Sequence, residues 1–452
     1  MKVKSIFIVL VLLVVLFSIG CTTFAPPGTD VPPGSKATGL LGFKQLDDSK
    51  STSEGLSELV LANNKFAVDY YTKLDSNPQN IGKNIFFSPF SISTAVGMTY
   101  EGADKNTAKE MQEVFYFPID DTTRQSSFAK LFNSLNESAA KGDYKLSVAN
   151  ALWNEKTYEF KQSFYDIIDN YYYGKSTPVD FKNAPEEQRQ LINKWVEEQT
   201  QQKIKELLPS QPPSIKSDTR MVLVNAIYFK GDWLSKFKAE NTVDSEFLVS
   251  ADKTVTTKMM QQTEKFNYYS DSQFQYLQLP YKGEDLSMVL LLPKGIETDC
   301  APNTDCIDEP VRIVYDFNIP SAETFALVKD KMNETKLTVS LPKFKFTAKY
   351  QMKQDLEQMG VREAFTDFAN FSKMDEANFV KIGEIYHKAF IEVNEEGTEA
   401  AAATGVVMVE KTAIEMPQIF NANHPFAFYI QDNKTGEILF LGKMLDPTQE
   451  GE

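Results

Sequence analysis

Cysteine, histidine and tryptophan are scarce in this chain of 452 residues, which contains three, two and three of them respectively. A Ser-His-Asp hydrolase would need His387 or His424 beside an exposed serine, and the G-x-S-x-G turn is missing. The H-E-x-x-H and C-x-x-C patterns and the glycine-rich phosphate loops are missing too. Carboxylate pairs for glycosidase chemistry stay open, because 62 acidic residues produce such pairs by chance. The sequence therefore carries none of the hydrolase, metal-site or phosphate-loop motifs tested, and we expect no metal and no cofactor.

Positive charge is also in short supply. Lysine and arginine total 47 against 62 aspartates and glutamates, which gives a net charge of -15 and a pI of about 4.9. An acidic surface repels phosphate backbones, so we expect no nucleic-acid partner. The 33 phenylalanines and 19 tyrosines argue against general disorder and predict a sizeable core.

The N-terminal residues 1–20 have the pattern of a signal peptide. Lys2 and Lys4 precede an apolar run from Ile6 to Phe17, which is shorter than the roughly 20 residues of a membrane-spanning helix. The run ends in Ser-Ile-Gly-Cys, which resembles a lipoprotein signal-peptidase site with Cys21 as the lipidated residue. Plain secretion with an incidental cysteine is the alternative. We expect an exported, extracellular or cell-surface protein that contacts a membrane only through this anchor.

Composition divides the rest of the chain into three parts. Residues 21–54 contain Pro-Pro-Gly twice and predict a flexible linker, residues 55–447 a single folded domain, and residues 448–452 a tail. Cys300 and Cys306 lie in a polar stretch, and in an exported protein they predict a small surface disulfide.

Helical and strand patterns alternate along the folded part, which predicts an α+β domain. Apolar residues at three- and four-residue steps indicate a helix from about Leu56 to Leu74. Near-continuous apolar runs at 221–230 and 288–292 predict central strands. Residues 337–347 predict one further strand, and Asp-Asn-Lys-Thr-Gly at 432–436 predicts a hairpin turn.

The segment from Glu395 to Thr412 reads EEGTEAAAATGVVMVEKT and has side chains too small to anchor a core. These residue types suit a peptide that is an exposed loop in one state and a buried strand in another. The segment therefore predicts a function that depends on a conformational change.

Four motifs resemble signatures of one family and occur in its order. They are FFSPFSISTAVGMTYEGADKNTAKEM (86–111), LVNAIYFKGDW (223–233), IYHKAFIEVNEEGTEAAAATGV (385–406) and NHPFAFYI with ILFLGKMLDP (423–447). The chain resembles the serpins, inhibitors of serine proteases, over residues 55–447. The resemblance implies an α+β fold with three β-sheets, about nine helices and an exposed reactive loop near the C-terminus. In the family mechanism a protease cleaves this loop, which then inserts as a strand into the largest sheet and traps the acyl-enzyme.

The hinge of the loop has the alternation that strand insertion needs. Counting from Thr398, the even-numbered residues would point inward and Glu399 outward, so a slip of one residue would bury a charge. Gly397 offers the backbone freedom of a hinge. The hinge residues predicted in this way are Glu395, Gly397, Thr398, Ala400, Ala401, Ala402, Ala403 and Thr404. This composition is that of inhibitory serpins; a non-inhibitory serpin that binds a ligand or acts as a chaperone is the alternative.

The family count of seventeen residues from Glu395 predicts cleavage between Lys411 and Thr412. A basic residue before the cleaved bond indicates a trypsin-like serine protease as partner, with a cysteine protease as a second option. A count shifted by one would place Glu410 before the bond and would favour a glutamyl protease. We expect the inhibitor itself to be a monomer.

The resemblance also implies roles for residues outside the loop. Ser88, Ser91, Asn225 and His387 match a polar cluster beneath the sheet where its strands part, a natural gate because such a network must be satisfied in both states. Trp233, Lys343 and Glu395 match the site where the loop enters, and Lys343 should pair with Glu395. The stretch 122–135 holds only two basic residues, so we expect no activation by acidic polysaccharides.

Overall fold

The computed structural model describes residues 44–172, 174–298, 312–315, 318–398 and 417–451. Several predicted features lie outside these ranges. They are the signal peptide, Cys21, Cys300, Cys306, Ala400, Ala401, Ala402, Ala403, Thr404, Lys411 and Thr412.

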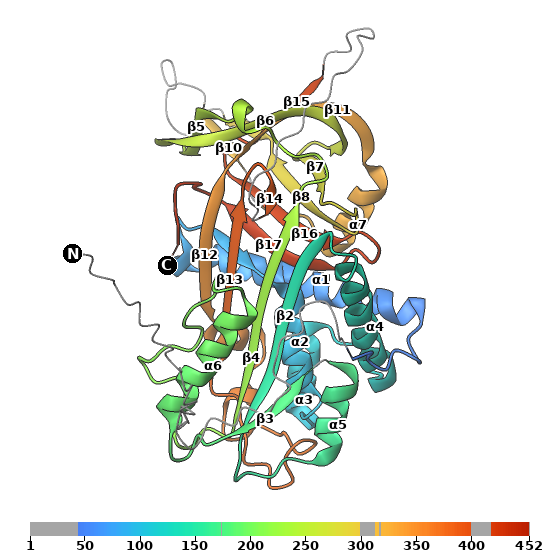
Figure 1. Cartoon of the computed structure of the whole chain (residues 1–452), viewed down its shortest axis with the longest axis vertical. Helices are drawn as coiled ribbons and strands as arrows, with labels where there is room; N and C mark the ends of the chain where they lie inside the picture. The colour runs from blue at the N-terminus through green and yellow to red at the C-terminus, as the bar shows by residue number, and fades with distance from the viewer. Residues whose placement is uncertain (1–43, 173, 299–311, 316–317, 399–416, 452) are drawn as a thin grey trace, which may run out of the picture. The chain divides into compact units, whose positions relative to one another are not determined.

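Helices and strands are mixed along the whole described chain, as the α+β prediction requires (Figure 1). The eight α-helices within the described ranges are α1 (Ser53–Ser76), α2 (Pro89–Tyr100), α3 (Lys105–Phe115), α4 (Asp121–Ala139), α5 (Gln162–Tyr171), α6 (Pro185–Gln199), α7 (Ala322–Lys331) and α8 (Lys353–Met359). Short 3-10 helices span Pro78–Asn80, Ala239–Asn241 and Glu363–Phe365.

The strands form three sheets. The six-stranded sheet has the order β12 (Phe344–Gln351), β13 (Tyr386–Val393), β14 (Gly397–Thr398), β4 (Met221–Asp232), β2 (Tyr144–Glu155) and β3 (Lys175–Val179). The nine-stranded sheet contains β1 (Ile85–Phe87), β17 (Ile438–Met444), β16 (Phe426–Asp432), β8 (Leu286–Pro293), β7 (Phe274–Pro280), β6 (Lys253–Ser270), β11 (Asn333–Pro342) and β15 (Gln418–Asn421), with β5 (Val243–Ser250) paired to β6. A small hairpin pairs β9 (Gly295–Thr298) with β10 (Arg312–Tyr315).

The folded part begins earlier along the chain than the predicted boundary at residue 55. Helix α1 begins at Ser53, where the Thr52 side chain accepts a hydrogen bond from the Gly55 N–H. Before it, Leu46 is buried, and its backbone exchanges two hydrogen bonds with the Asn133 side chain of α4. The last ten or so residues of the predicted linker therefore pack on the domain, because Leu46 finds an apolar site that its own sequence neighbourhood does not reveal.

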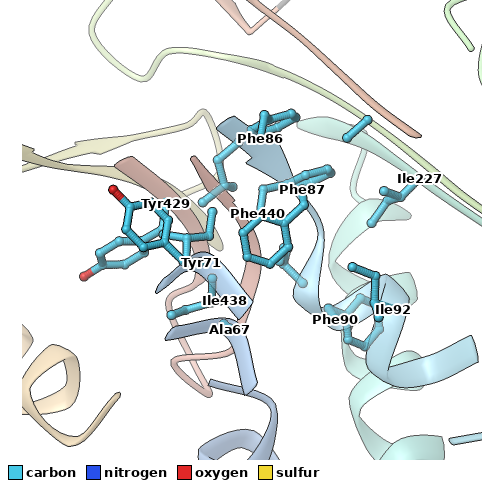
Figure 2. Packing of buried hydrophobic residues seen from close by; sticks show 14 of the residues in the cluster. Ala67, Tyr71, Phe86, Phe87, Phe90, Ile92, Ile227, Tyr429, Ile438 and Phe440 are labelled. Atoms are coloured by element: carbon cyan, nitrogen blue, oxygen red, sulfur yellow. The ribbon is translucent and has the colours of Figure 1, made fainter. Parts of the chain in front are cut away.

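Aromatic side chains fill the core between α1, α2 and the nine-stranded sheet (Figure 2). The Phe86 and Phe440 rings stack at 5.3 Å, and Phe87 meets Tyr70 edge-on at 5.2 Å. Each such ring contributes about 1.5–3 kcal/mol when removed from water. This packing joins β1, β17 and α1 in one aromatic core.

Both faces of the six-stranded sheet are covered. On one face, Val224 and Ala226 of β4 and Trp153 of β2 pack with Ile192 and Val196 of α6. Residues on the other face belong to the main aromatic core. A strand that enters this sheet must therefore carry small or apolar side chains toward the main core.

The predicted strand 337–347 is in fact the junction of two strands in different sheets. Strand β11 ends at Pro342 and β12 begins at Phe344, so Lys343 alone joins the nine-stranded sheet to the six-stranded sheet. The burial phase changes there, from odd-numbered residues such as Leu341 to even-numbered ones such as Phe346. The run looked continuous because apolar residues occur on both sides of the corner.

None of the helices within the described residues is both long and apolar enough to cross a membrane.

At the C-terminal end of the described chain, the Thr347 N–H of the edge strand β12 donates to the Glu450 carbonyl, and Gly451 forms a bridge with Thr347. The start of the predicted tail is therefore attached to the edge of the six-stranded sheet.

Candidate functional site

The hinge residues Gly397 and Thr398 already form a short strand, β14, between β13 and β4 at one end of the six-stranded sheet (Figure 1). Gly397 pairs with Asp232, and Thr398 pairs with Gly231 on β4 and with Val393 on β13. The reversal after β13 is held by the Asn394 N–H, which donates to the Gly397 carbonyl at 2.9 Å. The first rung of an additional strand is thus present in the sheet.

The hinge lies in the six-stranded sheet, whereas the sheet with the most strands within the described residues has nine. The reason is the length of β6, whose 18 residues pair with β5, β11 and β7 in succession. This strand joins what would otherwise be two smaller sheets into one of nine strands.

Gly397 meets the sheet so closely that no other residue fits there. Its φ is +156°, and a Cβ atom built on it would lie 2.1 Å from the Gly231 carbonyl oxygen and 2.7 Å from the Asp232 Cα. Both of these are backbone atoms, which cannot swing aside as a side chain can. Glycine is therefore required at this position for the hinge to enter the sheet.

Thr398 faces the core, as the predicted alternation requires at this position. It is 3% exposed, and its hydroxyl lies 2.8 Å from the Tyr281 hydroxyl. Tyr281 is itself buried and stacks on Trp233 at 4.7 Å, and burial raises the pKa of its phenol. The Thr398 side chain is therefore buried against an aromatic, uncharged neighbour.

The predicted entry residues Trp233, Lys343 and Glu395 are brought together. The Lys343 Nζ lies 2.7 Å from Glu395 Oε2, and Thr242 donates to Glu395 Oε1 at 2.8 Å. Burial acts to raise the pKa of Glu395, but these hydrogen bonds outweigh it and hold the pKa below its usual value. The Trp233 indole N–H donates to the Asn394 carbonyl at 3.0 Å. The expected ion pair between Lys343 and Glu395 is confirmed.

Three further residues at this entrance escaped sequence analysis. Tyr281 receives Thr398, Thr242 binds Glu395, and Lys236 pairs with Glu396. Lys236 lies three residues beyond Trp233, outside the 223–233 motif, so its position near the entrance is the one hint that the sequence offers. Tyr281 is separated from Thr398 by more than a hundred residues, so only the folded chain brings the two together.

A second polar cluster contains Ser88, Ser91 and His387, the last of which is near the start of β13. Ser88 begins helix α2: its hydroxyl accepts from the Ser91 N–H and donates to the Leu439 carbonyl at 2.6 Å. The Ser88 N–H donates to His387 Nε2 at 3.0 Å. Asn225, the fourth predicted member, lies on β4 opposite Asn150 of β2. Ser88, Ser91 and His387 are therefore brought together, whereas the Asn225 side chain lies outside the described ones and its membership stays a prediction.

Comparison with known proteins decides the family. The family profile described as serpin (serine protease inhibitor) matches residues 61–447. The chain belongs to the serpin family. Human serpin B4 is 39% identical over 409 residues, which cover 87% of this chain and all of that protein. The bovine leukocyte elastase inhibitor is 39% identical over 394 residues, again 87% of this chain and all of the relative.

The fold of this serpin is shared with solved structures. Human thyroxine-binding globulin, crystallised in complex with its hormone, superposes with a TM-score of 0.73 and 29% identity. The alignment covers 87% of this chain and all of that one. The predicted serpin fold is thus confirmed, and relatives named as protease inhibitors and a relative named for hormone binding are both among its neighbours.

The burial of His387 predicts that the stability of this serpin depends on pH. Burial lowers the pKa of His387 to about 3, and its Nε2 must stay unprotonated to accept from Ser88. The unfolded chain takes up this proton near the ordinary pKa of about 6.5. The contribution of His387 to the free energy of unfolding is therefore fully present above that pH and is lost as the pH drops toward 3. We expect the free energy of unfolding to fall by up to about 1.4 kcal/mol per pH unit below pH 6.

Urea unfolding at a series of pH values between about 7.5 and 5.5, above the range in which most carboxylates titrate, measures this dependence. His387→Gln keeps a side-chain acceptor for Ser88 but cannot titrate, and should make the profile shallower. The slope that remains belongs to His424, whose pKa is also lowered by burial. An equally steep profile for this variant would show that the proton is taken up elsewhere.

Proposed function

We propose that this serpin is a suicide-substrate inhibitor of trypsin-like serine proteases, cleaved between Lys411 and Thr412. The observation that carries the proposal is the position of Thr398, buried between β4 and β13 in the register that the inward phase requires. A hinge that has already entered the sheet with a small, uncharged side chain has begun the movement by which an inhibitory serpin traps its target.

The reaction follows from the family mechanism. The protease serine attacks the carbonyl carbon of Lys411, and the bond to Thr412 breaks, with the new amine leaving on the C-terminal side. The resulting ester joins Lys411 to the protease. If the released loop inserts before water attacks this ester, the protease is displaced with its active site distorted and the ester persists.

The first rung predicts the partners of the next residues along the loop. Continued in the same register, Glu399 would lie between Lys230 and Glu392, and Thr404 would lie beside His387. At a net 0.5–1.5 kcal/mol for each hydrogen bond, about ten new bonds would stabilise the inserted state by on the order of 10 kcal/mol. This gain is the driving force that the proposal requires.

The alternative is a serpin that binds a small ligand and traps no protease. The similarity to thyroxine-binding globulin favours keeping it as the second candidate. The two candidates differ in one observable, because only an inhibitor forms a covalent complex with its protease.

Mixing the purified protein with trypsin should give a complex that survives denaturing electrophoresis, together with the released C-terminal fragment. Lys411→Ala should lose this complex with trypsin, because the specificity pocket of the protease then has no basic residue to bind. Lys83→Ala serves as a matched control, since it removes an exposed lysine in the turn before β1. A loop that is cut while trypsin stays active and unbound would refute inhibition of trypsin.

Export and anchoring belong to the same proposal. We propose that the chain acts outside the cytoplasm as a monomer, held at the surface by a lipid on Cys21, with Cys300 and Cys306 bridged. The support is the N-terminal pattern and the composition of residues 21–43. Metabolic labelling with a radioactive fatty acid, with Cys21→Ser as control, tests the anchor.

A further inference from the structure

The side chain of Lys236 is clamped between two carboxylates at the entrance to the six-stranded sheet. Its Nζ contacts the Glu396 carboxylate and lies 3.2 Å from Asp232 Oδ2. The exposed fractions are 38% for the Lys236 side chain, 35% for Asp232 and 18% for Glu396. The ammonium group is therefore partly shielded, and its carboxylate partner on the hinge more so.

The same segment also binds the hinge through its backbone. The Trp233 N–H donates to the Glu396 carbonyl at 2.8 Å, and the Phe237 N–H donates to the Glu395 carbonyl at 2.9 Å. Residues 232–237 thus run alongside residues 394–397. Within this contact Lys236 supplies the positive charge from the β4 side, whereas Lys343 binds Glu395 from the corner between the two sheets.

Asp232 has two roles here. It is the residue that pairs with Gly397 in the first rung, and its carboxylate shares Lys236 with Glu396. Without the ammonium group, Asp232 and Glu396 would be two negative charges held side by side, which repel. The pKa of Lys236 is raised, first by its hydrogen bond to Glu396, in agreement with this close pairing.

We propose that Lys236 is a positioning residue that holds the hinge in the sheet before cleavage and fixes the register in which the loop inserts. It acts through Glu396: the ion pair keeps this residue against β4, and the next two residues, Gly397 and Thr398, then meet Asp232 and Gly231. The proposal deepens the proposed inhibitory function and rests on it for its consequence, but the position of the hinge can be measured separately.

Chemical labelling of a cysteine at position 398 measures that position directly. In Thr398→Cys, the new thiol replaces a side chain that is 3% exposed, so a maleimide should react with it slowly. Adding Lys236→Gln should accelerate the reaction about fivefold, the change expected for loss of a partly shielded ion pair. The labelled peptide is identified by mass spectrometry, which separates it from Cys21, Cys300 and Cys306.

Matched variants distinguish positioning from a general loss of charge. Lys282→Gln removes a lysine whose side chain pairs with Asp143 and whose backbone N–H donates to the Asp232 carbonyl at 2.8 Å. This variant should leave the labelling rate unchanged. Glu396→Gln should accelerate labelling as Lys236→Gln does. The exchange Lys236→Glu with Glu396→Lys should restore slow labelling in part, because it rebuilds the pair with reversed sign but sets a carboxylate at position 236 against Asp232.

For inhibition, the substitution should change the fraction of acyl-enzyme that is trapped rather than hydrolysed. Lys236→Gln should raise the number of inhibitor molecules consumed per trapped trypsin, while the rate constant of association changes by less than about twofold, since the reactive bond is untouched. An unchanged labelling rate in Lys236→Gln, or an equal acceleration in Lys282→Gln, would overturn the proposal. If the wild-type protein traps no protease, the inhibitory function fails while the labelling result still decides the role of Lys236.

Discussion

Replacing Thr398 by arginine should abolish the trapped complex with trypsin and turn the reactive loop into an ordinary substrate. The Thr398 side chain lies in a closed site against Tyr281, between Gly231 and Val393. An arginine cannot enter this site without burying an unpaired charge, which costs several kcal/mol. Insertion is then slower than hydrolysis of the acyl-enzyme. Titration of trypsin should show that the number of inhibitor molecules consumed per protease rises by at least about tenfold.

Thr398→Ser is the control for this experiment. It keeps the hydroxyl that meets Tyr281 and changes only one methyl group, so it should still form the complex. If the arginine variant forms as much complex as the wild type, the inward phase assigned to Thr398 does not apply to the inserted loop. The loop would then have to insert in another register or not at all.

Cleavage of the reactive loop should make this protein much harder to unfold. The cut releases the loop to complete the strand that begins at Gly397, with a gain on the order of 10 kcal/mol from the added ladder. For a domain of this size the melting temperature should rise on the order of 10 °C. Scanning calorimetry of the intact protein, and of protein nicked within the loop by a protease that it does not trap, measures the difference.

Gly397→Val provides the matched control. Its side chain would overlap the Gly231 carbonyl oxygen, so the first rung cannot form. The same cut in this variant should leave the melting temperature nearly unchanged. A wild-type protein whose nicked and intact forms melt together would show that the native sheet stores no free energy for insertion.

The sequence alone predicted the features that depend on local pattern. The sequence predicted that Thr398 faces the core, because a strand places successive side chains on opposite faces and the charged neighbour, Glu399, has to face outward. The corner at Lys343 was missed, although the burial phase changes there, since apolar residues continue on both sides of it. The early start of the domain was missed because Leu46 depends on a partner, Asn133, in a distant helix.

The entrance to the sheet shows where a family resemblance ends. Trp233, Lys343 and Glu395 were expected together because they match positions known from relatives. Tyr281 and Lys236 were not, because their contacts depend on how β4, β13 and the segment after β7 approach each other in space. Contacts between residues so far apart in the sequence depend on tertiary packing, and no local sequence pattern predicts them.

On the proposed function, the presence of β14 before cleavage should change the kinetics of loop insertion. A loop that had to find the sheet from solution would face a nucleation step, in which chain entropy is lost before any new hydrogen bond compensates for it. Here the rung from Gly397 to Asp232 is the nucleus and already exists. The strand β14 can then lengthen one residue at a time, and each added residue is stabilised at once by its new hydrogen bonds. Substitutions at Gly397 and Thr398 should therefore change the rate at which insertion begins. Substitutions farther along the loop should change only whether insertion is completed.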